Sequence, residues 1–349
     1  MNGWQRIQAI ATGQIPDRIP VFCNLFEQGA TELGLTIREY YSKPENVAEG
    51  QLRLRRKYDY DNLWGAFYIG KEAEMFGCRR MIFADNGPPN VGQLVLQSYE
   101  DIERLEIPTD VFSHPGFADT RRCLEILSRE SAGQYPVFAF VTSSTSLPAL
   151  LMGAEKWLEL LICGPFSLRD ELLRKCSLFV QRHIQACRQA GAQLCVYAAP
   201  FSTPGMLTPA LCREVGYPGI INDLSQPGPA DIVLHGGGMP LAPLLPELVG
   251  KLPLAACYLH PFDDIAACKQ VIAGRALCAG TINDIRLLSW TPTEVETEVN
   301  RILDAGMPGG GFCFGTLVMP FEIPVANIRA MLDAIRRYCE QQRSRHEAN

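Results

Sequence analysis

The chain alternates between short apolar runs and longer segments with helical periodicity. Eight runs are rich in β-branched and aromatic residues, at 18–24, 62–68, 136–142, 194–200, 232–238, 255–260, 276–282 and 310–316. Runs that are apolar almost throughout indicate strands buried on both faces, as in a parallel sheet covered by helices. Segments between them, such as 167–190 and 291–305, predict amphipathic helices, and the second opens with the N-terminal helix signal Thr-Pro-Thr-Glu.

Eight alternating strand and helix units predict an α/β fold, a (β/α)8 TIM barrel. We expect a single domain over residues 1–349, with an N-terminal helical extension at 1–17 and an insertion at 79–110. The insertion would contain a hairpin with arms at 80–85 and 93–97. A doubly wound open sheet is the competing fold, and the absence of G-x-G-x-x-G after the first strands disfavours it.

Composition narrows the class of protein. The net charge is −6 and no block of like charge occurs, which disfavours nucleic acid as a partner. The N-terminus does not resemble a signal peptide and no run of about 18 apolar residues is present, so we expect a soluble cytoplasmic protein without membrane contact. The 13 cysteines include no C-x-x-C pair and indicate a reducing compartment, where most would fill the core.

Function in such a barrel is expected at the carboxyl ends of the strands. Two of the five histidines, His235 and His260, fall at such ends. His235 stands between an apolar run and three glycines, where it could be a metal ligand, a general acid or base, or a packed core residue. His260 precedes Asp263, with which it could form a hydrogen-bonded pair, structural or catalytic.

Further candidates lie in the same loops. Glu214 follows a helix start at Thr208 and Pro209, and it is either a functional carboxylate or a solvated helix residue. Aromatic residues are frequent near the predicted mouth, where they would bind an aromatic substrate or simply pack: Phe22, Phe26, Trp64, Phe67, Tyr68, Phe201 and Phe321.

The order of several motifs resembles the uroporphyrinogen decarboxylase superfamily, which also holds corrinoid-dependent methyltransferases. The matching segments, spread over residues 4–335, are IPDRIPV, KEAEMFGC, LTPALCREVGYPGI, VLHGGG, AGTIND and GGFCFGTLVMPFEIPVANIRAML. The resemblance implies the same barrel.

Several residues differ from the family patterns, and these differences help to decide which branch of the superfamily the chain resembles. The decarboxylases need arginines near the first strand to bind a polycarboxylate, and the loop NLFEQGATELG has none. Methyltransferases that load coenzyme M hold zinc with H-x-C and a distant cysteine. Here Gly237 replaces the first cysteine, and Thr316 or Leu317 stands where the second is expected.

A third branch, which demethylates methyl ethers in anaerobic bacteria, looks closer. Its resemblance implies zinc ligands at positions 199, 214 and 235, of which Glu214 and His235 are present and Ala199 is not. We expect a metal set of His235, Glu214 and Cys313, with His260 or Glu72 as other third ligands. The catalytic residues would be His235, Glu214 and His260, and the substrate-binding residues Phe26, Tyr68, Asn24 and Asn283.

The resemblance thus implies a methyltransferase that moves a methyl group from a small donor, a methoxylated aromatic or other methyl ether, to Co(I). The chain has no D-x-H-x-x-G motif, so the corrinoid would arrive on a separate corrinoid-binding protein. Glycines 236–238 and 309–311 would leave space for the corrin face. Zinc, or a proton from His235 or Glu214, would assist the leaving oxygen.

Other functions stay open. They are a methylcobamide-linked methyltransferase with another acceptor, a decarboxylase-like enzyme, and a non-catalytic barrel that binds a corrinoid protein. A homodimer is compatible with the sequence.

Overall fold

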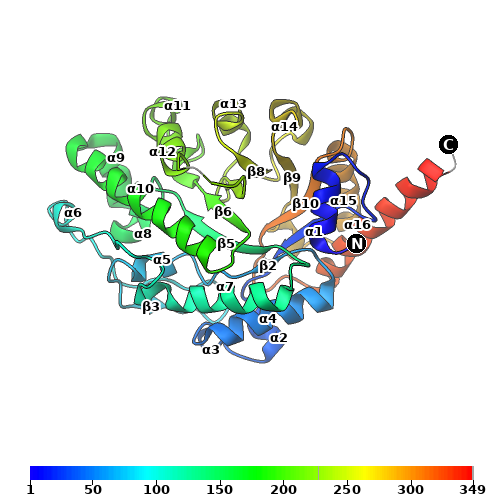
Figure 1. Cartoon of the computed structure of the whole chain (residues 1–349), viewed down its shortest axis with the longest axis horizontal. Helices are drawn as coiled ribbons and strands as arrows, with labels where there is room; N and C mark the ends of the chain where they lie inside the picture. The colour runs from blue at the N-terminus through cyan, green and yellow to red at the C-terminus, as the bar shows by residue number, and fades with distance from the viewer. Residues whose placement is uncertain (227, 348–349) are drawn as a thin grey trace.

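A computed structural model describes residues 1–226 and 228–347. Eight parallel strands form a nearly closed barrel, which confirms the predicted fold (Figure 1). In spatial order they are β1 (Val21–Asn24), β10 (Phe312–Val318), β9 (Leu277–Ile282), β8 (Leu254–Tyr258), β7 (Ile232–His235), β6 (Leu194–Ala198), β5 (Val137–Thr142) and β2 (Leu63–Trp64). Each strand falls within or beside a run that the sequence predicts.

Helices surround the strands in a ring (Figure 1). Each strand is followed by at least one of these helices: α4 (Pro44–Tyr58), α7 (Ala118–Ser131), α10 (Phe166–Gln189), α12 (Tyr217–Asp223), α13 (Leu245–Leu248), α14 (Ile265–Ile272), α15 (Pro292–Gly306) and α16 (Val325–Glu347). The predicted start of α15 is confirmed, because Thr291 and Glu294 form a capping box and Pro292 occupies the first turn.

Side chains complete the barrel where β1 and β2 do not pair as strands. Buried Asn62 accepts a hydrogen bond from the Cys23 amide at 2.9 Å and donates to the Cys23 carbonyl at 3.3 Å. Its neighbour Asp61 accepts from the Val21 amide at 2.9 Å and forms ion pairs with Arg6 and Arg18. The amide and carboxylate groups thus replace backbone bonds that a wider contact between β1 and β2 would supply.

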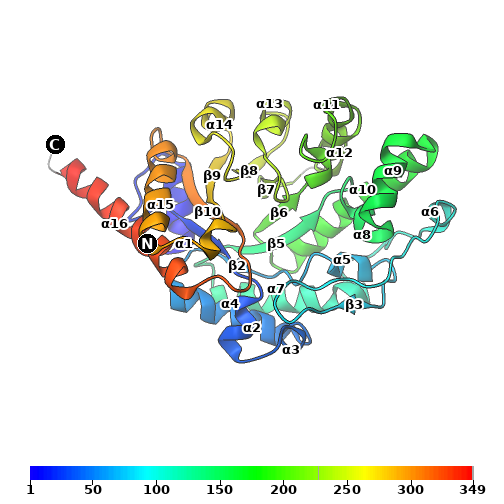
Figure 2. The same cartoon turned by 180° about the vertical axis from the view of Figure 1, so that it is seen from behind.

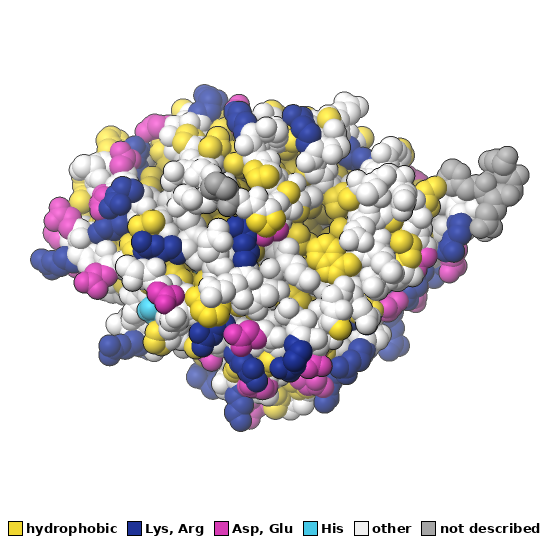
Figure 3. Space-filling view, viewed as in Figure 1, with side chains coloured by type: hydrophobic (Ala, Val, Ile, Leu, Met, Phe, Trp, Pro, Cys, Tyr) yellow, Lys and Arg dark blue, Asp and Glu magenta, His cyan; other side chains and the backbone are white. Residues whose placement is uncertain are grey.

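The N-terminal helix α1 (Gly3–Ala11) covers the amino end of the barrel, in front of the strands in Figure 1. Its Ile7 and Ile10 belong to the same buried cluster as Val233 and Ala256, which point inside the barrel. On this face charged side chains of both signs lie mainly around the edge, with hydrophobic ones nearer the middle (Figure 3).

The excursion after β2 contains the antiparallel pair β3 (Met81–Ile82) and β4 (Asn90–Val91). The expected second arm at 93–97 is wrong. Leu96 in that stretch is buried, and its amide donates to the Leu151 carbonyl of α8 (Leu147–Met152), so it packs on a helix. Among the described residues, no helix is long and apolar enough to cross a membrane.

Candidate active site

His235 is the last residue of β7 and His260 follows β8 by two residues, so the carboxyl ends of these paired strands (Figure 2) bring both histidines to the mouth of the barrel. Side chains alternate along a strand, and Val233 on β7 and Tyr258 on β8 both face the interior. His235 and His260, each two residues further on, therefore continue the inward-facing rows.

A backbone hydrogen bond fixes the His235 imidazole. Its Nδ1 accepts from the Gly237 amide at 2.7 Å, so the neutral ring carries its proton on Nε2. Burial, together with the nearby His260, lowers the pKa of His235 to about 4, which keeps the ring uncharged at neutral pH. The Nε2 atom has no partner among the described residues and is not sealed from water. His235 is thus a neutral hydrogen-bond donor.

His260 repeats this arrangement one strand away. Its Nδ1 accepts from the Phe262 amide at 3.2 Å, and burial lowers the pKa of its imidazole against the opposing effect of Asp263 and Asp284. The expected His260–Asp263 pair is not formed through the ring. Instead, the Asp263 carboxylate accepts three backbone bonds, from the His260, Leu241 and Ala242 amides at 2.8, 2.9 and 3.2 Å.

Tyr258 packs against the His235 ring. Its ring centroid lies 5.4 Å from that of His235. Its hydroxyl reaches past β9 to β10, where it donates to the Thr316 carbonyl at 2.9 Å and accepts from the Thr316 amide at 3.0 Å. This buried side chain therefore connects β8 to β10 and supports the His235 ring.

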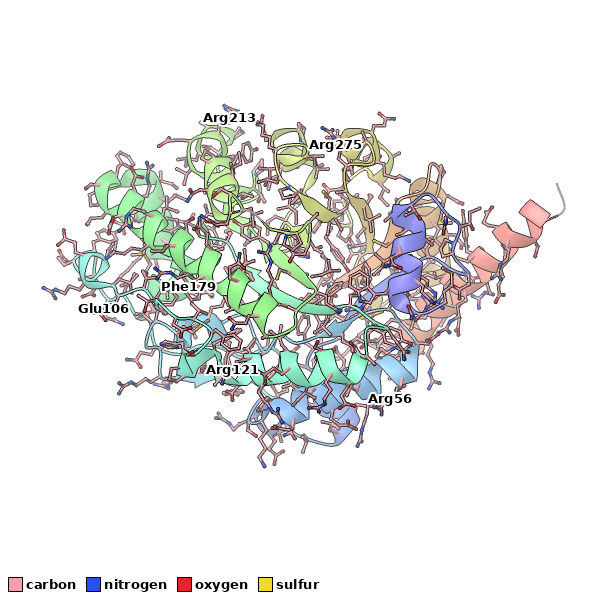
Figure 4. All side chains as sticks on the ribbon, viewed as in Figure 1. Arg56, Glu106, Arg121, Phe179, Arg213 and Arg275 are labelled. Atoms are coloured by element: carbon pink, nitrogen blue, oxygen red, sulfur yellow. The ribbon has the colours of Figure 1, made fainter. Side chains whose placement is uncertain are left out.

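Glu214 is not joined to His235 by any hydrogen bond or ion pair among the described residues. It lies in the π-helical turn Cys212–Gly216, where Pro218 cannot donate to the Glu214 carbonyl. Its side chain is 57% exposed and accepts from Arg169 at 3.0 Å. The neighbouring Arg213 lies at the outer edge of the molecule (Figure 4). Glu214 is thus a surface carboxylate in this structure, as its alternative interpretation held.

Cys313 does not meet His235 either. β10 is separated from β7 by β9 and β8, and no hydrogen bond joins the Cys313 thiol to His235 among the described residues. The thiol is fully buried among interior residues and bonds the Cys278 carbonyl at 3.6 Å, and burial raises its pKa. A thiolate ligand is disfavoured there.

The expected zinc set does not fit these side chains. The Nε2 proton of His235 would have to leave, Glu214 is held by Arg169, and Cys313 lies apart. Within residues 1–226 and 228–344, no three His, Cys, Asp or Glu side chains form a group able to hold a metal ion. We therefore assign no step to zinc.

The expected substrate-binding residues have different surroundings. The Asn24 side chain is occupied, because its amide donates to the Thr316 carbonyl at 2.5 Å and accepts from Trp64 Nε1 at 2.9 Å. The Tyr68 hydroxyl donates to the Glu74 carboxylate at 2.6 Å. Phe26 packs on Trp64 at 5.0 Å inside the barrel. Asn283 is half-buried and accepts from the Arg286 amide at 2.9 Å.

The two glycine clusters lie at opposite ends of the molecule. A Cβ at Gly236 would meet the Met239 carbonyl oxygen at 2.1 Å, and one at Gly237 would meet Pro200 at 2.5 Å, whereas Gly238 faces open space. The 309–311 cluster precedes β10 and lines a cavity of about 730 Å³ near α1. That cluster is therefore at the amino end and does not border the mouth that holds His235.

Sequence reasoning singled out neither Tyr258 nor Asp284. Asp284 follows β9, interacts with His260, and has a pKa raised by burial. Both residues lie at predicted strand ends, Tyr258 two residues from His260 and Asp284 next to Asn283. This closeness to other candidates is the feature of the sequence that could have identified them.

The chain is similar to one protein family and to several solved structures. A family model described as Uroporphyrinogen decarboxylase (URO-D) matches residues 3–338. A solved methyltransferase from Methanosarcina mazei is 17% identical with a TM-score of 0.84, covering 97% of this chain and 99% of its own. A putative vitamin-B12 independent methionine synthase from Listeria monocytogenes is 14% identical with a TM-score of 0.53, covering 93% and 96%. No curated protein matches significantly.

Proposed function

Because this chain belongs to the uroporphyrinogen decarboxylase family, we propose that it is a methyltransferase that demethylates a small methyl ether. The methyl acceptor would be a corrinoid carried by a separate protein. The fold, shared along nearly the whole chain with a protein named a methyltransferase, supports this choice within the family. The observation that carries the proposal is the neutral Nε2–H donor of His235 at the barrel mouth.

The loop after β1 argues against a porphyrinogen substrate. Where a polycarboxylate would need arginines, this loop has Glu27, which is 3% exposed and accepts from the Tyr41 hydroxyl at 2.8 Å. Burial raises the pKa of Glu27, and any ionised fraction would repel the acidic side chains of a porphyrinogen. Glu27 therefore favours a neutral donor.

The rim of the mouth suits a protein partner. Large apolar side chains are exposed at the end of β10 and in the segments that follow β2, β8, β9 and β10: Ile69, Phe262, Ile285, Leu288, Val318 and Val325. Phe262 is 78% exposed. Apolar side chains gathered around a site in this way are typical of a docking surface.

The corrinoid, when bound, would supply a Co(I) nucleophile for the methyl carbon. In this chain, His235 donates its Nε2 hydrogen bond to the ether oxygen as the C–O bond breaks. The bonding electron pair stays on that oxygen, and the donor stabilises the developing negative charge.

Neutral imidazole stabilises charge without giving up its proton easily. The best leaving group is therefore one that is stable as an anion, an aryl oxide rather than an alkoxide. We expect methyl groups on phenolic oxygen to be transferred in preference to those on aliphatic oxygen.

The test supplies the purified chain with free cob(I)alamin and either guaiacol or the methyl ether of cyclohexanol, and measures catechol or cyclohexanol. Catechol formation that needs the protein supports the proposal. Release of cyclohexanol at an equal rate would exclude the neutral-donor mechanism. No methyl transfer from either compound, with stable binding of a corrinoid protein, would indicate the non-catalytic barrel instead.

A further inference from the structure

His235 and His260 lie on one wall of the mouth, in neighbouring inward-facing rows. His235 pairs in register with Tyr258, and His260 stands two residues after Tyr258 on the same face. The rings are near enough for the charge of one to affect the other. The two imidazoles can therefore address the same small group.

The same local contact orients both rings. Each Nδ1 accepts from the amide two residues further along, which leaves each neutral ring with its proton on Nε2. Neither Nε2 has an acceptor among the described residues, and neither is among the fully buried polar atoms. Two N–H donors are thus available at the mouth without an acceptor.

Asp263 joins the two loops that carry these rings. Its carboxylate is 9% exposed and accepts from the His260 amide on one loop and the Leu241 and Ala242 amides on the other. Bonds from one carboxylate to both loops restrain their separation. The spacing between the imidazoles therefore depends on Asp263.

We propose that His235 and His260 form a two-donor site for one oxygen of an aryl oxide, with Asp263 as the positioning residue. The identity of this oxygen as the leaving group rests on the proposed function. Two preorganised donors directed at one developing negative charge stabilise it more than one donor does. Because both donors are uncharged, the anionic product can still leave the site and a neutral ether can take its place.

The direct test uses the full chain with ¹⁵N-labelled histidine rings and para-nitrophenolate as the probe. We expect the Nε2 signals of both His235 and His260 to shift on binding, and the bound nitrophenol to ionise at lower pH than the free compound. Nitrobenzene, which lacks the oxygen anion, should shift neither signal. His114 is the internal reference, because its Nδ1 also accepts from the amide two residues on, at 3.1 Å.

Variants separate the second donor from general packing. His260→Ala should weaken para-nitrophenolate binding about tenfold, in line with loss of one hydrogen bond to an anion, and leave nitrobenzene binding unchanged. His260→Gln, which retains an N–H donor, should recover part of the affinity. Asp263→Asn should move both Nε2 signals in the free protein and weaken the probe, while His114→Ala should do neither.

The outcomes distinguish this inference from the proposed function. A His260→Ala protein that binds para-nitrophenolate like the wild type overturns the two-donor site, even if guaiacol is demethylated. Binding as described, with no demethylation of guaiacol, supports the site and contradicts methyl transfer. Movement of the His260 signal alone by Asp263→Asn would overturn its role as a positioning residue for both rings.

Discussion

At the scale of single residues, His235 is defined by one backbone bond and by burial. The bond to the Gly237 amide selects the ring tautomer, and burial keeps the ring neutral. These two effects change a residue type usually associated with proton transfer into a hydrogen-bond donor. The chemistry proposed here follows from that change.

The low pKa of His235 predicts that acid destabilises the fold. The unfolded chain takes up the proton near pH 6.5, whereas the folded chain resists it down to about pH 4. As the pH is lowered from 6.5 to 4, this group should therefore reduce the unfolding free energy by about 3 kcal/mol. Above pH 6.5 it should have no effect on the unfolding free energy. Denaturant titration at several pH values, compared between wild type and His235→Gln, isolates this contribution.

A direct titration checks the cause. The ring signals of His235 should stay those of a neutral imidazole from pH 8 to 5. Protonation with an ordinary pKa near 6.5 would contradict both the acid effect and the neutral-donor mechanism.

At the scale of elements, the barrel wall between β1 and β2 depends on Asp61 and Asn62. Asp61 is fully buried and is shared by Arg6, Arg18 and the Val21 amide. Asp61→Asn leaves two arginines without their common partner and should cost about 3–5 kcal/mol of unfolding free energy.

Asp59 provides the matched control in the same loop. It contacts Arg18, Arg55 and Arg336, but its side chain is 54% exposed, so Asp59→Asn should cost under about 1 kcal/mol. Equal losses measured for the two variants by thermal or denaturant unfolding would contradict this account of barrel closure.

The hydrophobic pattern predicts the strands because each one is buried on both faces and must be apolar along its length. The pattern does not predict that Asn62 closes the barrel, because this contact depends on how β1 and β2, which do not pair as strands, approach each other. Only half of the site follows from the pattern. Strand parity turns His235 inward, and Cys313 also faces the interior, but on a strand separated from β7 by β9 and β8. Glu214 lies beyond the strands, next to Arg169.

The tautomer of His235 is equally hidden in the sequence. It depends on the turn that brings the Gly237 amide to Nδ1, and on close packing of Gly236 and Gly237 against Met239 and Pro200. Motif resemblance indicated a histidine at this position but implied a metal-binding role, which these contacts do not fit.

At the scale of the whole molecule, the amino end of the barrel is covered by a helix, whereas the carboxyl end is open to a partner. Helix α1 covers the amino end with Ile7 and Ile10. At the other end, apolar side chains remain exposed around the two histidines, so a partner can contact the mouth without disturbing the core. This division agrees with the proposal that the methyl acceptor arrives on another protein.

The most direct measurement of the central claim is the rate at which Co(I) absorbance disappears when cob(I)alamin and guaiacol are mixed with the protein. Wild type and His114→Ala should show the same rate, and His235→Ala should be about 100-fold slower or worse, the usual effect of removing one such donor. His235→Ala and wild type reacting at equal rates would contradict the account, as would a wild-type rate no faster than the solution without protein.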